Sequence, residues 1–173
     1  MKGVRALSLS DSEEVLRINS ESRPGVASLD TAEIERLIAI PNEHLVIDGP
    51  ERGLLGYLLA FRNDASYDGE EFVSFTEMDL EAFIYIDQVA VDAGFRQAGL
   101  ASTLYGVLEE RAKDSFASYL CCEINLNPPN PTSLAFHRNK GFNQTGNLNT
   151  KDGRTVALMT KRLVHTETGA RET

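Results

Sequence analysis

The sequence predicts a single α/β domain over residues 1–173, with a central mixed β-sheet of about six to seven strands flanked by about four helices. Strand and helix patterns follow one another in the order β α α β β β α β α β β along the chain. The apolar stretches 83–91 and 119–126 enclose a helical pattern, and such a crossover unit makes its two strands parallel neighbours. Turn signals near 49–53 and 151–153 indicate antiparallel hairpins, so the sheet is mixed.

The chain begins with a predicted strand at 4–9 and a predicted helix at about 11–19. Ser10 stands at the expected N-cap and Glu13 follows three residues later, which is the pattern of a capping box. Residues 20–28 contain a proline and a glycine. They are therefore predicted to form a loop.

A second short helix is predicted after Asp30, which with Glu33 repeats the capping pattern, and it stops near Pro41. Two strands follow at 44–48 and 54–61, and the proline and glycines between them favour a hairpin. The stretch 83–91 is apolar and rich in β-branched residues, which suits a central strand buried on both faces.

The second half of the chain alternates between helices and strands. Leucines at helical spacing predict a helix at 98–113, and a shorter helix at about 132–140 ends at Gly141, a typical C-terminal glycine. The segments 142–147 and 156–163 are predicted to form the last hairpin. The polar residues 164–173 are expected to form a frayed tail.

Residues 63–81 form an irregular insert between two predicted strands. The insert contains seven carboxylates and no Lys or Arg. Such a segment attracts an amine if it borders a binding site, and it is otherwise a solvated surface loop. Tyr67, Phe72 and Phe75 indicate that part of it packs against the protein. Its carboxylates are Asp64, Asp68, Glu70, Glu71, Glu77, Asp79 and Glu81.

Composition restricts the class of protein. The net charge is −9, which argues against a nucleic-acid partner, because phosphate binding over a large surface needs a basic face. No apolar run approaches a membrane span, and the N-terminus lacks the pattern of a signal peptide, so a cytoplasmic protein is expected. Cys121 and Cys122 point to opposite faces of a strand, and the histidines and cysteines show no metal-ligand spacing, so no metal is expected.

The most informative segment is the turn Arg96-Gln-Ala-Gly-Leu-Ala101, which joins the strand 83–91 to a helix. Free backbone N–H groups at a helix N-terminus favour a phosphate, and Arg96 adds a positive charge. Neither a Walker loop nor a dinucleotide-binding glycine motif is present. The small residues by themselves are equally compatible with a tight turn that only needs glycine at Gly99.

Two blocks of sequence resemble the GNAT superfamily of N-acetyltransferases. Arg96-x-x-Gly99-x-Ala101 is similar to motif A, although Ala93 stands where the family's lead-in usually has proline. Residues 130–142 are similar to motif B, whose usual tyrosine is replaced here by His137. The resemblance implies that the strands 83–91 and 119–126 splay apart to admit the pantetheine arm of acetyl-CoA, the co-substrate.

The resemblance also implies which residues hold acetyl-CoA. The backbone of Val89 and Val91 would bind the pantetheine amides, the amides of the turn would bind the pyrophosphate, and Asn130 would contact the arm. The complete implied set is Val89, Ala90, Val91, Arg96, Gln97, Ala98, Gly99, Leu100, Ala101, Ser102, Asn130, Ser133, Phe136 and His137.

Three residues are candidates for catalysis by direct attack of an amine on the thioester. His137 takes the place of the family's acid, and it either protonates the leaving thiolate or only contacts the cofactor. Asp87 and Glu123 are carboxylates in apolar strands, where an unpaired charge is costly, so each is a candidate base or a member of an internal salt bridge. A water chain is the alternative base.

The resemblance therefore implies an acetyl-CoA-dependent N-acetyltransferase that acts on a primary amine of a small molecule or a protein. The alternative is a non-catalytic acyl-CoA-binding regulatory module, which the missing tyrosine keeps open. Acetyl-CoA and an amine are the expected partners, without nucleic acid or membrane, and a homodimer is compatible with the family. The loops 20–28 and 63–81 are the expected acceptor walls.

Overall fold

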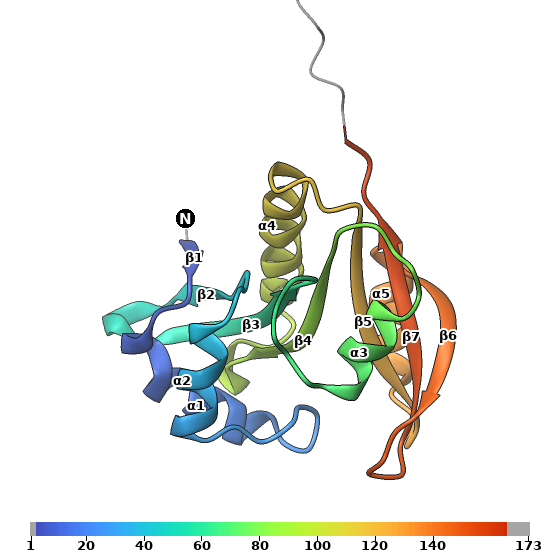
Figure 1. Cartoon of the computed structure of the whole chain (residues 1–173). Helices are drawn as coiled ribbons and strands as arrows, with labels where there is room; N and C mark the ends of the chain where they lie inside the picture. Colours follow the sequence, from blue (N-terminus) through green and yellow to red (C-terminus); the bar gives the residue numbers. More distant parts are fainter. Residues whose placement is uncertain (1–2, 166–173) are drawn as a thin grey trace, which may run out of the picture.

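The computed structural model describes residues 3–165, and the rest of the predicted tail at 164–173 lies outside them. Seven strands form one sheet in the order β1-β2-β3-β4-β5-β7-β6 (Figure 1). Only β4 and β5 pair in parallel, so the predicted mixed sheet and its crossover unit are confirmed. The strands are β1 (Val4–Ala6), β2 (Leu45–Asp48), β3 (Leu54–Arg62), β4 (Phe83–Val91), β5 (Tyr119–Asn127), β6 (Asn143–Asn149) and β7 (Thr155–Arg162).

Helices cover both faces of the sheet. The apolar side chains of α1, α2 and α3 pack into one buried cluster with one face of the strands. Those of α4 and α5 pack into a second cluster on the opposite face. The helices are α1 (Ser12–Ser22), α2 (Thr31–Ala39), α3 (Glu70–Thr76), α4 (Leu100–Asp114) and α5 (Pro131–Asn139).

The two parallel strands separate in the middle of the sheet. Their pairing runs from Phe83 with Tyr119 to Ile86 with Cys122, and it ends there. Beyond this point β4 continues to pair with β3, and β5 continues to pair with β7. The splay that the resemblance implied is therefore present, and it leaves one edge of β4 open.

A β-bulge lies on β4 where the two strands part. Ala60 pairs with Ile86 and Leu59 pairs with Gln88, so Asp87 is the extra residue. A bulge changes the alternation of a strand, and bulges are common next to active sites. Both Asp87 and Gln88 therefore face the side of the sheet that α1, α2 and α3 cover.

The first strand is shorter than predicted. Only Val4–Ala6 pair with β2, and residues Leu9–Asp11 form a 3₁₀ turn instead. The capping box is made by Ser8 and Asp11, two residues before the predicted pair, because the Asp11 carboxylate accepts from the N–H and hydroxyl of Ser8. The sequence pattern predicted a capping box correctly but placed it two residues too late in the chain.

The insert is more regular than predicted, because it contains the helix α3. Phe72 and Phe75 of this helix are buried among aromatic side chains of β4. Burial of these two rings fixes a short helix that local propensity does not reveal. Residues 3–165 thus contain five α-helices, one more than the four that the sequence pattern predicts.

The placement of the two cysteines is a further sequence-based expectation that can be compared with the fold. Cys121 and Cys122 belong to different buried clusters and are both free thiols, as the alternation of a strand predicts. Within residues 3–165, no helix has the length and apolar character that a membrane crossing requires. The same residues contain no group of three or more metal-ligating side chains.

Candidate active site

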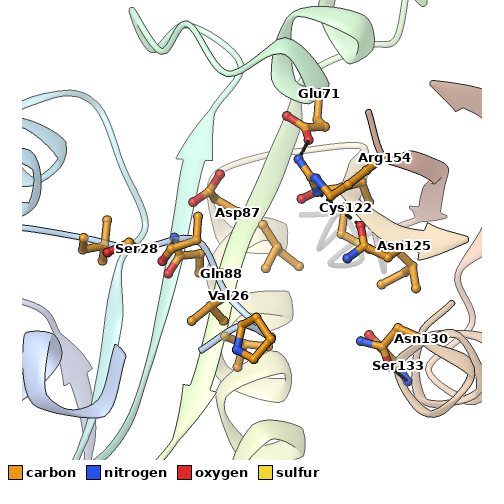
Figure 2. A pocket seen from close by; sticks show the side chains of 18 of the residues that line it. Val26, Ser28, Glu71, Asp87, Gln88, Cys122, Asn125, Asn130, Ser133 and Arg154 are labelled. Atoms are coloured by element: carbon orange, nitrogen blue, oxygen red, sulfur yellow. Dashed lines mark hydrogen bonds and ion pairs between the residues drawn. The ribbon is translucent and has the colours of Figure 1, made fainter. Parts of the chain in front are cut away.

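A cavity of about 590 Å³ opens where β4 and β5 part. Its walls come from the loop between α1 and α2, from the insert, from the open part of β4 and β5, and from α5 and the β6–β7 turn. Figure 2 shows Val26, Ser28 and Gln88 on one side of it, and Asn125, Asn130 and Arg154 on the other. The separation of the two strands therefore creates both the cavity and its access to the sheet interior.

Two carboxylates on the α1–α3 side of the sheet face this cavity, and each accepts a hydrogen bond from a tyrosine. The Tyr67 hydroxyl donates to Asp87 Oδ1 at 2.7 Å. The Tyr85 hydroxyl donates to Glu123 Oε2 at 2.8 Å. Tyr67 comes from the insert, so the insert supplies a direct partner to a predicted catalytic residue.

The surroundings of these carboxylates favour their protonated forms. Burial raises the pKa of Asp87 to about 6, although the Tyr67 hydrogen bond opposes the shift, and the Glu71 charge raises the pKa further. Burial and then the charge of Asp87 raise the pKa of Glu123 well above its usual range. A carboxylate that titrates near neutral pH is suited to accept a proton.

Arg154 of the β6–β7 turn is the only cation among the described residues that line the cavity, and it is already paired. It donates to Glu71 Oε1 at 3.0 Å, to Asn125 Oδ1 at 3.2 Å and to Asp152 Oδ2 at 2.8 Å. Figure 2 shows it beside Glu71 and away from Asp87. Asp87 and Glu123 are therefore left with neutral partners.

His137 lies on the opposite face of the sheet from the two carboxylates and is almost fully buried. Its Nδ1 lies 2.7 Å from the Ser133 carbonyl oxygen, which can only accept, so Nδ1 carries the proton. Its Nε2 lies 2.7 Å from the Tyr105 hydroxyl and accepts from it. Burial lowers the pKa of His137, so the ring is neutral near pH 7.

The turn before α4 has the geometry of an anion cradle. Gly99 caps the helix with a φ of 75°, and a Cβ added there would meet no atom within 4 Å. The first backbone hydrogen bond of α4 runs from the Thr103 N–H to the Gly99 carbonyl oxygen. Among the described residues, the backbone N–H groups of residues 97–102 therefore have no protein acceptor. The turn is exposed, and its open amides fit a phosphate group.

The structure brings some of the predicted residues to the cavity and leaves others outside it. Asp87, Val89, Glu123, Asn130, Ser133 and His137 line the cavity. Ala90 and Val91 continue along the open edge of β4, and the residues from Arg96 to Ser102 form the exposed turn and the start of α4.

Two members of the predicted set have structural partners. Asn130 caps α5, because its side chain accepts from the Ser133 N–H at 3.1 Å. Phe136 packs edge-on against Tyr105, with ring centroids 5.4 Å apart. Phe136 lies outside the residues that line the cavity.

Sequence reasoning missed several residues that line the cavity or contact its lining. Tyr85, Tyr105 and Arg154 gave no local signal, because a tyrosine in an apolar stretch and an arginine in a turn are ordinary at such positions. Tyr67 and Glu71 lie in the insert 63–81, a predicted acceptor wall, and the aromatic residues of the insert are the one local signal that it packs against the protein. The three tyrosines contact Asp87, Glu123 and His137, and Glu71 pairs with Arg154, only through the tertiary fold.

A comparison with protein-family sequence models adds independent support to this geometry. Residues 13–142 match the model described as the acetyltransferase (GNAT) family. The matched region includes the splayed strands, the turn before α4 and the whole of α5. A comparison with curated proteins found no match.

Solved structures with the same fold cover nearly the whole chain. The ribosomal-protein-S18-alanine N-acetyltransferase from Escherichia coli is 12% identical with a TM-score of 0.73, and the match covers 99% of this chain and 100% of that one. The phosphinothricin acetyltransferase from Sinorhizobium meliloti, in complex with AcCoA, is 18% identical with a TM-score of 0.70, covering 99% and 97%. The ribosomal-protein-alanine N-acetyltransferase from Brucella melitensis is 21% identical with a TM-score of 0.68, covering 93% and 99%.

Proposed function

The chain belongs to the acetyltransferase (GNAT) family and is an acetyl-CoA-dependent N-acetyltransferase, and on this premise we propose that its acceptor is a cationic primary amine that binds between Asp87 and Glu123. The observation that carries the proposal is the cavity at the splay of β4 and β5, where both carboxylates face one space with tyrosines as their partners.

Acetyl-CoA binds along the open edge of β4 and over the turn before α4. The free N–H groups of residues 97–102 hold its pyrophosphate, and Arg96 adds a charge-assisted contact. The backbone of Val89 and Val91 binds the pantetheine arm, so the thioester lies near the end of the β4–β5 pairing. An acidic protein can bind this anion because the local field of the turn is positive.

Asp87 and Glu123 act as one base. Burial raises the pKa of both carboxylates, and the charge of Asp87 raises the pKa of Glu123 further, so both titrate at higher pH than exposed carboxylates do. The pair takes a proton from the bound ammonium, and the neutral nitrogen attacks the thioester carbonyl carbon. The C–S bond then breaks, the attacking nitrogen loses a second proton as the amide forms, and the leaving thiolate takes up one proton in exchange.

The charges of the cavity favour a cationic acceptor. Five carboxylates line it, namely Glu33, Glu71, Asp87, Glu123 and Asp152, against the single guanidinium of Arg154. An ammonium group gains from this field, whereas an acceptor with a carboxylate next to its amine meets repulsion. The E. coli and B. melitensis structures are named for protein acceptors and the S. meliloti structure for a small molecule, so both acceptor sizes belong to the test.

The remaining predictions concern nucleic acid, the non-catalytic alternative, cellular location and a homodimer. The net charge of −9 gives no basis for a nucleic-acid partner. The family match and the fold do not favour the non-catalytic alternative. A cytoplasmic location and a homodimer stay predictions from the sequence.

The decisive experiment measures thiol release from acetyl-CoA with three acceptor sets: diamines and polyamines, peptides with free N-termini, and amino acids with free carboxylates. We expect the cationic acceptors to have the highest kcat/KM. We also expect their KM to rise with ionic strength, because salt screens the field of the cavity.

Calorimetric titration with acetyl-CoA, without acceptor, is the control for the donor site. Binding of acetyl-CoA without thiol release by any acceptor would contradict catalysis and favour the regulatory module. A KM for cationic amines that does not change with salt would contradict the proposed acceptor class alone.

A further inference from the structure

The loop between α1 and α2, residues 23–30, is held in place by a buried hydrogen-bond network. Asn19 of α1 is 1% exposed. Its Nδ2 donates to the Ala27 carbonyl oxygen at 2.9 Å, and its Oδ1 accepts from the Leu29 N–H at 3.1 Å. The Gln88 side chain also donates to the Ala27 oxygen, at 3.3 Å. One asparagine thus binds the backbone of the loop at two points.

The loop depends on this network because it has no regular structure of its own. Between Arg23 and Asp30 it belongs to neither helix and pairs with no strand. In the described chain, its other backbone hydrogen bonds lie near its two ends, from the Gly25 N–H to the Ser22 oxygen at 2.9 Å and from the Ile34 N–H to the Asp30 oxygen at 3.0 Å. Val26 and Leu29 are only partly buried where they pack against the core.

The same loop is one wall of the active-site cavity. Residues 24–29 all line it, opposite the wall that Asn125, Asn130 and Arg154 form (Figure 2). Residues 24–29 have no long, flexible side chain, so the position of the wall is set by where the backbone is held. The loop therefore determines the width of the acceptor side of the cavity.

The network also reaches the strand that carries Asp87. Asn19 Nδ2 lies 2.9 Å from the Tyr57 hydroxyl and 3.1 Å from Gln88 Oε1. The Tyr57 hydroxyl donates to Gln88 Oε1 at 3.0 Å. Gln88 follows Asp87 at the bulge, and the bulge is what turns its side chain toward Asn19. The side-chain amide of Asn19 thus connects the α1–α2 loop to Gln88, the neighbour of the candidate base Asp87.

We propose that Asn19 is a positioning residue for acceptor specificity, which sets the spacing between the α1–α2 loop and Asp87. This inference rests on the proposed function, because it assigns the loop to the acceptor and not to acetyl-CoA. The Asn19 side chain does not line the cavity, so it acts through the loop and through Gln88.

The test is the substitution Asn19→Ala, assayed with the best acceptor of the wild-type protein. Without the Asn19 hydrogen bonds the α1–α2 loop adopts many conformations. Acceptor binding must then order the loop, and this ordering costs binding free energy. We expect the acceptor KM to rise roughly tenfold, with less than a roughly twofold change in kcat and in the dissociation constant for acetyl-CoA. Amide hydrogen exchange of Leu29 should accelerate in the same variant.

Asn42→Ala is the matched control. Asn42 clamps another loop in the same way, because its Nδ2 donates to the oxygens of Ile38 and Ile40 and its Oδ1 accepts from the His44 N–H. It lies outside the cavity lining. We expect Asn42→Ala to lower the melting temperature and to leave the acceptor KM unchanged.

If Asn19→Ala does not fold, Gln88→Met removes the second bond to Ala27 and keeps the volume of the side chain. We expect it to raise the acceptor KM roughly threefold, because one of the two tethers to Ala27 persists. An unchanged KM in a folded Asn19 or Gln88 variant, or an equal rise in the Asn42 variant, overturns the inference. Failure of the proposed function looks different, since the wild-type protein would then release no thiol with any amine.

Discussion

Two aspartates of this protein show how the same side chain serves different ends. Asp11, near the N-terminus, accepts two hydrogen bonds of 2.8 Å from the Arg5 guanidinium and further ones from Ser8. These bonds lower the pKa of Asp11 to about 2. Asp87, at the cavity, has a tyrosine and the nearby Glu71 charge instead of a cation, and burial raises its pKa to about 6.

The difference lies in whether a cation offsets burial: the Arg5 guanidinium outweighs the effect of burial on the pKa of Asp11, and burial dominates the pKa of Asp87. A carboxylate that is paired with a guanidinium stays ionised at every physiological pH and contributes to the stability of the fold. A carboxylate that is removed from water and paired only with phenols titrates near neutral pH and costs stability when it ionises. The surroundings of Asp87 thus give it a pKa that suits proton transfer, at a cost to the stability of the fold.

The largest expected effect on activity comes from replacing the carboxylates of Asp87 and Asp11, one at a time, by amides. Asp87→Asn should lower kcat/KM for the acceptor about 100-fold or more, because half of the proposed base is lost. Asp11→Asn should leave the kcat/KM of the folded protein unchanged and lower its stability by about 1–3 kcal/mol. Steady-state kinetics and thermal unfolding of both variants at pH 7.5 measure the two effects.

The pH dependence of stability separates the same two residues. The stabilisation from Asp11 is present above pH 4 and lost as the pH falls toward 2, since its folded pKa is depressed. The folded pKa of Asp87 is raised, so stability is lost as the pH rises through about 6, and Asp87→Asn should remove that loss. A loss of stability in Asp87→Asn at pH 7.5, with activity retained, would reverse the assignment.

A smaller effect is expected at His137, which is a buried titratable group without any charged partner. His137→Ala should lower kcat roughly tenfold while the dissociation constant for acetyl-CoA changes less than about twofold. Both ring nitrogens are engaged in hydrogen bonds, so the contribution of the ring passes through the Tyr105 hydroxyl. Stopped-flow kinetics and calorimetry measure the two quantities.

Tyr105→Phe is the companion variant, since it keeps the ring and removes the hydroxyl. If the pair acts in protonation of the thiolate, Tyr105→Phe and His137→Ala should lower kcat by similar factors, and the double variant should add little. An unchanged kcat in His137→Ala would exclude the acid role for His137.

The smallest effects, and the most specific, are shifts of the acid limb of the pH profile. Tyr67→Phe removes a hydrogen bond that lowers the pKa of Asp87, so the limb should move to higher pH. Glu71→Gln removes a negative charge that raises this pKa, so the limb should move to lower pH. Shifts of about 0.5–1 pH unit in opposite directions are expected in kcat/KM.

The direction of the two pH shifts is more informative than their size. A general loosening of the site would shift both profiles in the same direction or lower both rates without a shift. Two profiles that coincide with that of the wild-type protein would show that Asp87 is not the group whose ionisation limits the reaction.

The turn before α4 and the element order could be predicted from sequence because both depend on neighbouring residues. Gly99 with a φ of 75°, and the open amides after it, belong to one short stretch. The helices with clear apolar spacing were found for the same reason. The capping box at Ser8 was misplaced because its Asp11 also pairs with Arg5 of β1, and α3 was missed because burial of its aromatic rings against β4 stabilises it.

The sequence by itself determined the mixed sheet, its crossover unit and the family's acetyl donor, because these depend on periodicity and on two short motifs. Only the tertiary structure decided what surrounds Asp87. Tyr67 from the insert, Glu123 from β5 and Asn19 through Gln88 meet there after the sheet is assembled and the bulge turns β4. The pKa of a carboxylate depends on water and charges within a few ångströms, and those neighbours come from distant parts of the chain.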